Sequence, residues 1–229
     1  METKKLIETI DNINTLLGDD LKTTIKSNSH VRIAAAAFSI YAFEALSEEL
    51  KEIDQFEFLF TQNVFKPSEH VGRMDKERRQ YMIPPLQLSS DLAGSPFEIV
   101  LKNKLTQKAI ARECADWVRK KGRFLINASG KRAQPIATVE AEGVATAYLG
   151  MEHFTAPSLG YQPSDALSNH VMRMEGPAAD GLVQTLESLM GADDFKEVTQ
   201  SLLDHIERIY AENAPELIYF LLILSLIHI

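Results

Sequence analysis

The side chains that could carry out chemistry are few and widely separated along this chain of 229 residues. Five of its six histidines show no paired spacing suited to metal binding or acid–base catalysis: His30, His70, His170, His205 and His228. The single cysteine, Cys114, has no partner for an internal disulfide and suits a reducing compartment. We therefore expect no metal site and a cytoplasmic location.

The sequence NASGK, residues 127–131, contains a Gly-Lys pair of the kind found in phosphate-binding loops. A Walker-type loop needs a second glycine five positions before Gly130 and a Ser or Thr after the lysine. This chain lacks that glycine, and Arg132 occupies the Ser or Thr position. The segment is interpreted as a turn, and no nucleoside triphosphate site is predicted.

Positive charge is concentrated in one segment of an otherwise acidic protein. Residues 97–132 hold ten Lys or Arg against three acidic residues, whereas the whole chain has a formal net charge of −8. That balance argues against a general nucleic-acid coat but allows a local site. The candidate residues are Lys104, Lys108, Arg112 and Arg119 on one helical stripe, followed by Arg123, Lys131 and Arg132 on a strand and turn. The alternative is an ordinary solvated helix face.

The elements that would position these residues alternate between strands and helices. The apolar run VRIAAAAF, residues 31–38, predicts a buried strand, YAFEALSEELKEI a helix, and QFEFLFT, residues 55–61, a half-buried strand. A strand–helix–strand order predicts a right-handed crossover between parallel strands. Residues 62–96 are rich in proline and charge and are interpreted as a long loop or insertion.

The most clearly defined helix is predicted over residues 95–121. Ser95, Pro96 and Glu98 form a capping-box pattern at its start. Its expected buried stripe consists of Phe97, Leu101, Leu105, Ile110, Cys114 and Trp117. Strands are expected at residues 122–127, 134–142 and 143–152, and amphipathic helices at 178–190 and 193–212. The predicted fold class is α/β, with a mixed sheet flanked by helices and helices at the C-terminal end.

Three stretches carry a resemblance to a known family: FEIVLKNKLTQKAIARECADWVRKKGRF, GVATAYLGMEHFTAPSLGY and IYAENAPELIYF. Together they resemble the N-terminal phospholipase-D-like region of large bacterial helicases of the Swi/Snf or DEAD-box type, and the resemblance covers residues 31–221. It implies a phospholipase-D-like half in residues 1–175 and a helical extension, residues 176–223, leading to a downstream motor. ATP and Mg would belong to that motor, with no cofactor in this chain.

The resemblance also implies which catalytic residues an active relative would carry. Phospholipase-D-type enzymes use an H-x-K motif: the His attacks phosphorus, the Lys holds phosphate oxygens, and a second His protonates the leaving group. The motif stands shortly before a Gly-Ser-Ser-Asn-type turn, which matches Gly150 to His153 here. The preceding window, residues 130–143, contains no histidine. His153 takes the asparagine position and is interpreted as a surface or structural residue, so no catalytic residue is predicted.

The chain ends in the apolar run LIYFLLILSLIHI. At about 13 residues, this run is shorter than the roughly 20 that a membrane-spanning helix needs, so no membrane association is expected. Its last six residues, 224–229, match the translation of a sequencing adapter. The natural sequence is therefore expected to continue differently after residue 223; the alternative is that the tail is a genuine C-terminal strand.

Two functions remain open at this point. The first is a noncatalytic accessory module that positions DNA, RNA or a partner for a helicase motor in the same polypeptide, in a defence or restriction context. The second is a phospholipase-D-type phosphodiesterase or nuclease. The missing H-x-K motif favours the first.

Overall fold

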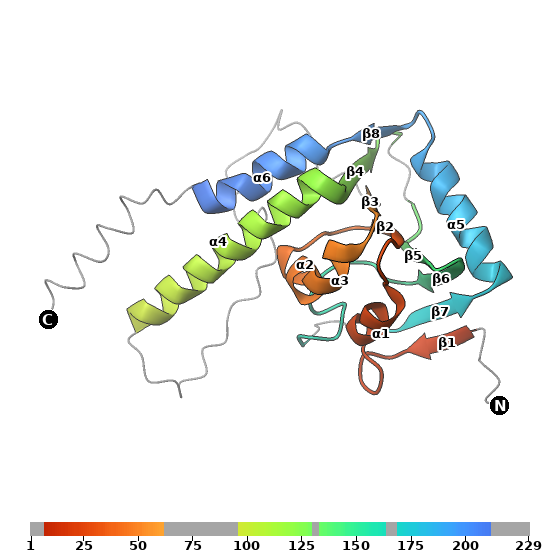
Figure 1. Ribbon diagram of the computed structural model, residues 1–229, viewed down its shortest axis with the longest axis horizontal. Helices are drawn as coiled ribbons and strands as arrows, with labels where there is room; N and C mark the ends of the chain where they lie inside the picture. The colour runs from red at the N-terminus through yellow and green to blue at the C-terminus, as the bar shows by residue number, and fades with distance from the viewer. Residues whose placement is uncertain (1–6, 62–95, 130–132, 164–168, 212–229) are drawn as a thin grey trace, which may run out of the picture.

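A computed structural model describes residues 7–61, 96–129, 133–163 and 169–211 of the chain (Figure 1). Side chains are described for these residues except within 96–105 and 208–211. The loop predicted at residues 62–96 and the tail at residues 224–229 lie outside these ranges, apart from Pro96, so what the sequence predicts for them stays a prediction. In the described ranges, no helix combines the length and the apolar character that a membrane span requires.

One mixed sheet of eight strands forms the framework, in the order β1-β7-β6-β5-β2-β3-β4-β8. Strands β2, β3 and β4 are parallel to one another, and every other neighbouring pair is antiparallel. The strands are β1 (Ile7–Ile10), β2 (His30–Ala35), β3 (Gln55–Phe60), β4 (Gly122–Asn127), β5 (Ile136–Ala141), β6 (Val144–Leu149), β7 (Val171–Glu175) and β8 (Phe195–Glu197). The predicted mixed sheet is confirmed.

Helices cover both faces of this sheet (Figure 1). They are α1 (Leu17–Thr24), α2 (Ile40–Ala45), α3 (Ser47–Glu52), α4 (Pro96–Lys121), α5 (Pro177–Met190) and α6 (Thr199–Ala211). The main core, under every helix except α5, contains Phe56, Phe58, Phe124 and Trp117. A second core on the opposite face joins Leu59 and Leu125 to Leu186 of α5. The predicted flanking helices are confirmed.

Strand β3 differs from the prediction in its burial. Its aromatic alternation suggested a half-buried strand, yet Phe56 to Phe60 are buried throughout. Phe56 and Phe58 point toward the main core, whereas Leu59 points toward α5. The prediction was wrong because the alternation identified one covered face and gave no sign that α5 covers the other.

The predicted crossover is confirmed in its main feature, since β2 and β3 pair in parallel from His30↔Gln55 to Ala35↔Phe60. The intervening helix is divided in two, because Leu46 leaves helical geometry between α2 and α3. Ser39 caps α2 by accepting a hydrogen bond from the Tyr41 amide.

Helix α4 runs from Pro96 to Lys121, as predicted. Of its expected buried stripe, Ile110, Cys114 and Trp117 are buried, and Trp117 Nε1 donates to the Leu50 carbonyl at 2.7 Å. Ser95 and the side chains of Phe97, Leu101 and Leu105 lie outside the described residues.

The end of the described chain contains one element that the sequence did not predict. Phe195 was expected in the last helix but begins β8, which pairs antiparallel with the edge of β4. The last helix, α6, starts only at Thr199 and lies along the C-terminal half of α4 (Figure 1). Strands β1 and β7 were also not predicted.

Candidate nucleic-acid interface and a charged row across the sheet

The predicted basic stripe lies on α4. Residues at spacings of four and seven fall on one side of an α-helix, which places Lys104, Lys108, Arg112 and Arg119 in one row. Arg112 and Arg119 are exposed and Lys108 is partly exposed, whereas the side chain of Lys104 lies outside the described residues. The opposite side of α4 is held in the core by Ala111, Cys114 and Val118. The helix therefore presents Lys108, Arg112 and Arg119 to solvent.

Arg119, at the C-terminal end of the row, is bound by two carboxylates. Its Nη1 atom donates to Asp116 Oδ1 at 2.6 Å, within the same helix. Its Nη2 atom donates to Glu207 of α6. The local positive charge of the row is therefore partly neutralised at this end by a neighbouring element.

Arg123 does not join the row. It lies directly opposite Glu57 in the β3–β4 register, and its Nη1 atom is 2.9 Å from Glu57 Oε1. Because side chains alternate between the two faces of a strand, Arg123 and the core residue Phe124 point to opposite sides of the sheet. The structure thus separates Arg123 from α4. Lys131 and Arg132 lie outside the described residues.

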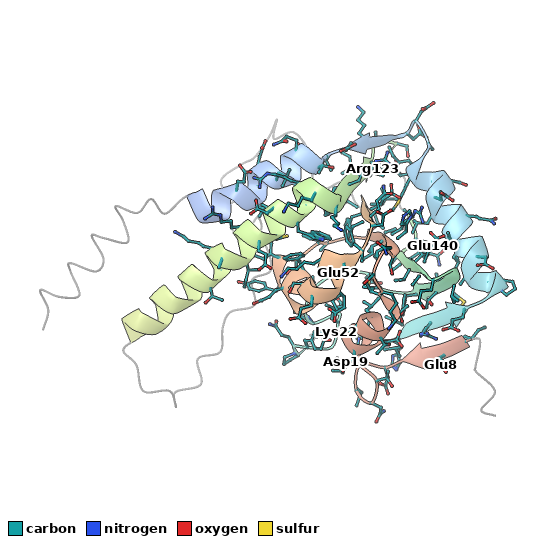
Figure 2. The ribbon with its side chains drawn as sticks, viewed as in Figure 1. Glu8, Asp19, Lys22, Glu52, Arg123 and Glu140 are labelled. Atoms are coloured by element: carbon teal, nitrogen blue, oxygen red, sulfur yellow. The ribbon has the colours of Figure 1, made fainter. Side chains whose placement is uncertain are left out.

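Arg123 belongs instead to a row of alternating charges that crosses five strands on the face covered by α5. The row is Glu140, Arg32, Glu57, Arg123 and Glu197, from β5, β2, β3, β4 and β8. Figure 2 labels Glu140 on β5 and Arg123 on β4, the two strands that flank β2 and β3 in the sheet. Opposite charges on neighbouring strands stabilise a sheet where like charges would repel.

Arg32 is the member of this row that also contacts α5. Its Nε atom lies 2.9 Å from Glu57 Oε2, Nη1 pairs with Glu140, and Nη2 lies 3.5 Å from Glu187 Oε1 on α5. Burial alone would lower the Arg32 pKa, but the hydrogen bond and charge of Glu140, together with the charge of Glu57, raise it. Arg32 is therefore a permanent cation that fastens three strands and α5 together.

This row was not predicted from the sequence, although the sequence contains a signal for it. Arg32, Glu57 and Arg123 each interrupt an otherwise apolar strand. A charged side chain in a central strand is seldom buried without a partner. Three such interruptions with alternating signs on consecutive parallel strands would have indicated mutual pairing.

A second polar cluster connects α1 to the opposite face of the sheet. The fully buried Tyr148 donates to Asp20 Oδ2 at 2.7 Å, and Arg173 Nε also lies 3.1 Å from Asp20 Oδ2. Arg173 pairs with Glu175 as well, at 2.6 Å. Burial, followed by the charge of Asp20, raises the pKa of Tyr148 above its usual range. This hydroxyl therefore stays protonated at neutral pH and donates to Asp20.

The resemblance would place the H-x-K motif in residues 130–143, and the described part of this segment contains neither a histidine nor a lysine. The centre of the 130–143 window is strand β5, whose Ile136, Ala137, Thr138 and Val139 are buried. His153 is partly exposed, and its Nδ1 atom contacts the carbonyl of its neighbour Glu152 at 2.8 Å. Across the described part of the chain, no group of three or more His, Cys, Asp or Glu side chains is arranged to hold a metal ion.

The comparisons with known proteins give structural similarity at low sequence identity. No protein-family model matches the chain, and neither does any curated protein. Among solved structures, it is similar to phosphatidylserine synthase from Haemophilus influenzae Rd KW20, with 10% sequence identity and a TM-score of 0.46. The similarity covers 92% of this chain and 47% of that one, so the chain spans about half the length of the synthase. Neither the identity nor the TM-score is high enough to transfer an activity or a site.

Proposed function

We propose that this chain is a noncatalytic phospholipase-D-like module that positions nucleic acid for an ATP-dependent DNA helicase motor in the same polypeptide. The family, the motor and its ATP and Mg come from the resemblance of residues 31–221. The observation that carries the noncatalytic part is the burial of strand β5. Where an active relative needs an exposed His and Lys, this chain has the buried side chains Ile136, Ala137 and Thr138.

The nucleic-acid part of the proposal is supported by α4. Its row of Lys108, Arg112 and Arg119 lies on a helix whose opposite side packs in the main core. Cations at such spacings can neutralise neighbouring phosphates, and each contact releases counterions. The contacts involve the phosphate backbone and carry no base information, so binding is expected to be local, independent of sequence and sensitive to salt.

A nuclease assay tests the noncatalytic part. Purified protein is incubated with plasmid DNA and with labelled single strands, with and without a divalent metal ion. No cleavage above that of a buffer control is expected. Cleavage that survives purification controls and disappears in His153→Ala would support the alternative, a phospholipase-D-type phosphodiesterase, and overturn this proposal.

A binding assay tests the nucleic-acid part. We expect Lys108→Glu/Arg112→Glu to abolish binding of a labelled DNA duplex at low salt, because two phosphate contacts become repulsive. The matched control is Lys22→Glu/Lys26→Glu, which makes the same change of charge at two exposed lysines outside α4 and should retain binding. If wild-type protein binds neither DNA nor RNA at low salt, or if the α4 variant keeps its affinity, α4 is not a nucleic-acid interface.

A further inference from the structure

Helix α6 brings an acidic side chain to the basic row on α4. Glu207 binds Nη2 of Arg119, while Asp116 binds Nη1. A phosphate normally uses the fork of an arginine by accepting two parallel N–H bonds. In this structure the two outer nitrogens of the Arg119 fork are directed at carboxylates instead.

The position of Glu207 is fixed by the core rather than by the ion pair alone. Its neighbour Ile206 is 3% exposed, and Leu202 and Leu203, one turn earlier, are also buried in the main core. These three side chains pack in the same core as the buried side of α4, and α6 lies along the C-terminal half of α4 (Figure 1). The packing of α6 therefore keeps Glu207 beside Arg119, so the ion pair does not itself have to hold the helix in place.

We propose that Glu207 is an internal competitor of phosphate at Arg119, so that α6 restrains the nucleic-acid affinity of the α4 row. This inference rests on the proposed function, since it concerns regulation of the same surface. A phosphate approaching Arg119 must displace Glu207 or accept its repulsion. Any rearrangement that moves α6 away from α4 would then add one phosphate contact to the row.

The ion pair is partly exposed, with side-chain exposures of 42% for Arg119 and 38% for Glu207, so its effect is modest. Exposed pairs contribute up to about 1 kcal/mol, which corresponds to about a two- to fivefold change in affinity. One additional phosphate contact also steepens the dependence of log affinity on log salt by about 0.9.

The test measures binding of a short labelled DNA duplex by fluorescence anisotropy over a range of salt concentrations. Glu207→Gln is expected to raise affinity by about two- to fivefold at low salt and to steepen the salt dependence. Glu187→Gln removes the same charge on the opposite side of the sheet and should leave affinity unchanged. In an Arg119→Ala background, Glu207→Gln should have no effect. Melting temperatures of all variants, with Glu207→Ala as a second replacement, show that each protein is folded.

The outcomes separate this inference from the proposed function. If Lys108→Glu/Arg112→Glu abolishes binding but Glu207→Gln leaves it unchanged, the competitor role is overturned while the interface stands. An equal gain from Glu207→Gln with and without Arg119 would also overturn it, because the effect would then be one of general charge. If neither wild-type protein nor Glu207→Gln binds the duplex at low salt, the proposed interface itself fails.

Discussion

Arg32 and Glu57 lie directly opposite each other on the parallel strands β2 and β3, and their side chains pair at 2.9 Å with only 9% exposure each. The pair stands at the centre of a row of charges between the sheet and α5. Such a pair is costly to break from one side, because the buried carboxylate of Glu57 then loses the partner of one of its two oxygens and keeps only Arg123.

Arg32→Met is therefore expected to lower the free energy of unfolding by about 3 to 5 kcal/mol, measured by urea denaturation. The matched control is Arg112→Met, the same replacement at an exposed position of α4, which should change stability by roughly 0.5 kcal/mol or less. Adding Glu57→Leu to Arg32→Met should recover part of the loss, because it removes a buried carboxylate that has lost one of its two ion-pair partners and keeps only Arg123. A single Arg32→Met variant as stable as wild type would contradict this role.

The elements predicted from the sequence are those whose signal is local. The strand VRIAAAAF and the helix α4 were identified because an apolar run or an apolar periodicity is complete within a few residues. Strands β1 and β7 were missed because their four or five residues mix charged and apolar types. Among the described strands, β1 pairs only with β7, which connects Ile7 to Met174 across most of the chain, and β7 also pairs with β6.

The candidate site also combines features that have a local sequence signal with features that depend on long-range contacts. Helical spacing placed Lys108, Arg112 and Arg119 on one side of α4. It could not show that Glu207, 88 residues later, binds Arg119. Nor could it show that Arg123, one residue into the strand after α4, points to the opposite face of the sheet. Both facts depend on tertiary packing and on strand register, neither of which is encoded in local spacing.

Cys114 is expected to be unreactive in the folded protein. Its side chain is fully buried on α4, and burial, with a smaller contribution from the charge of Glu113, raises the thiol pKa well above its ordinary value of 9.0. Ellman's reagent should therefore give no rapid reaction at neutral pH and one thiol equivalent after denaturation. Fast, complete reaction of the native protein would show that α4 is not packed as described.

Two helical glycines provide a matched pair of substitutions. A Cβ added at Gly18 of α1 would lie 2.4 Å from the ring of Tyr161, whereas one at Gly181 of α5 would have nothing within 4 Å. Gly181→Ala should stabilise the protein by about 0.5 to 1 kcal/mol through helix propensity. Gly18→Ala should destabilise it by about 1 to 3 kcal/mol, because Tyr161 must move and lose its 2.8 Å hydrogen bond to Asp19. Thermal melts measure both changes.

The control for this pair is Gly18→Ala in a Tyr161→Ala background. Removing the ring removes the clash, so the same Gly18→Ala change should then be neutral or stabilising. A destabilisation of equal size with and without the ring would assign the cost to the α1 backbone rather than to Tyr161.

The raised pKa of Tyr148 predicts how the free energy of unfolding changes with pH in alkaline solution. Burial and the nearby charge of Asp20 raise its pKa in the folded protein above the ordinary value of 10.0, which the unfolded chain keeps. Above about pH 10 the unfolded state therefore loses this proton while the folded state retains it. Because the folded state then binds more protons, stability is complete below pH 10 and falls as pH rises, by up to about 1.4 kcal/mol per pH unit for this group.

Tyr148→Phe should abolish this contribution while leaving the rest of the alkaline titration in place. At neutral pH the variant should lose about 0.5 to 1.5 kcal/mol, because Asp20 no longer accepts the 2.7 Å hydrogen bond from the hydroxyl. Above pH 10 its free energy of unfolding should decline less steeply than that of wild type, so that the difference between the two proteins narrows with rising pH. Urea denaturation at a series of pH values measures both curves. Curves that remain parallel above pH 10 would mean that Tyr148 ionises as readily in the folded protein as in the unfolded chain.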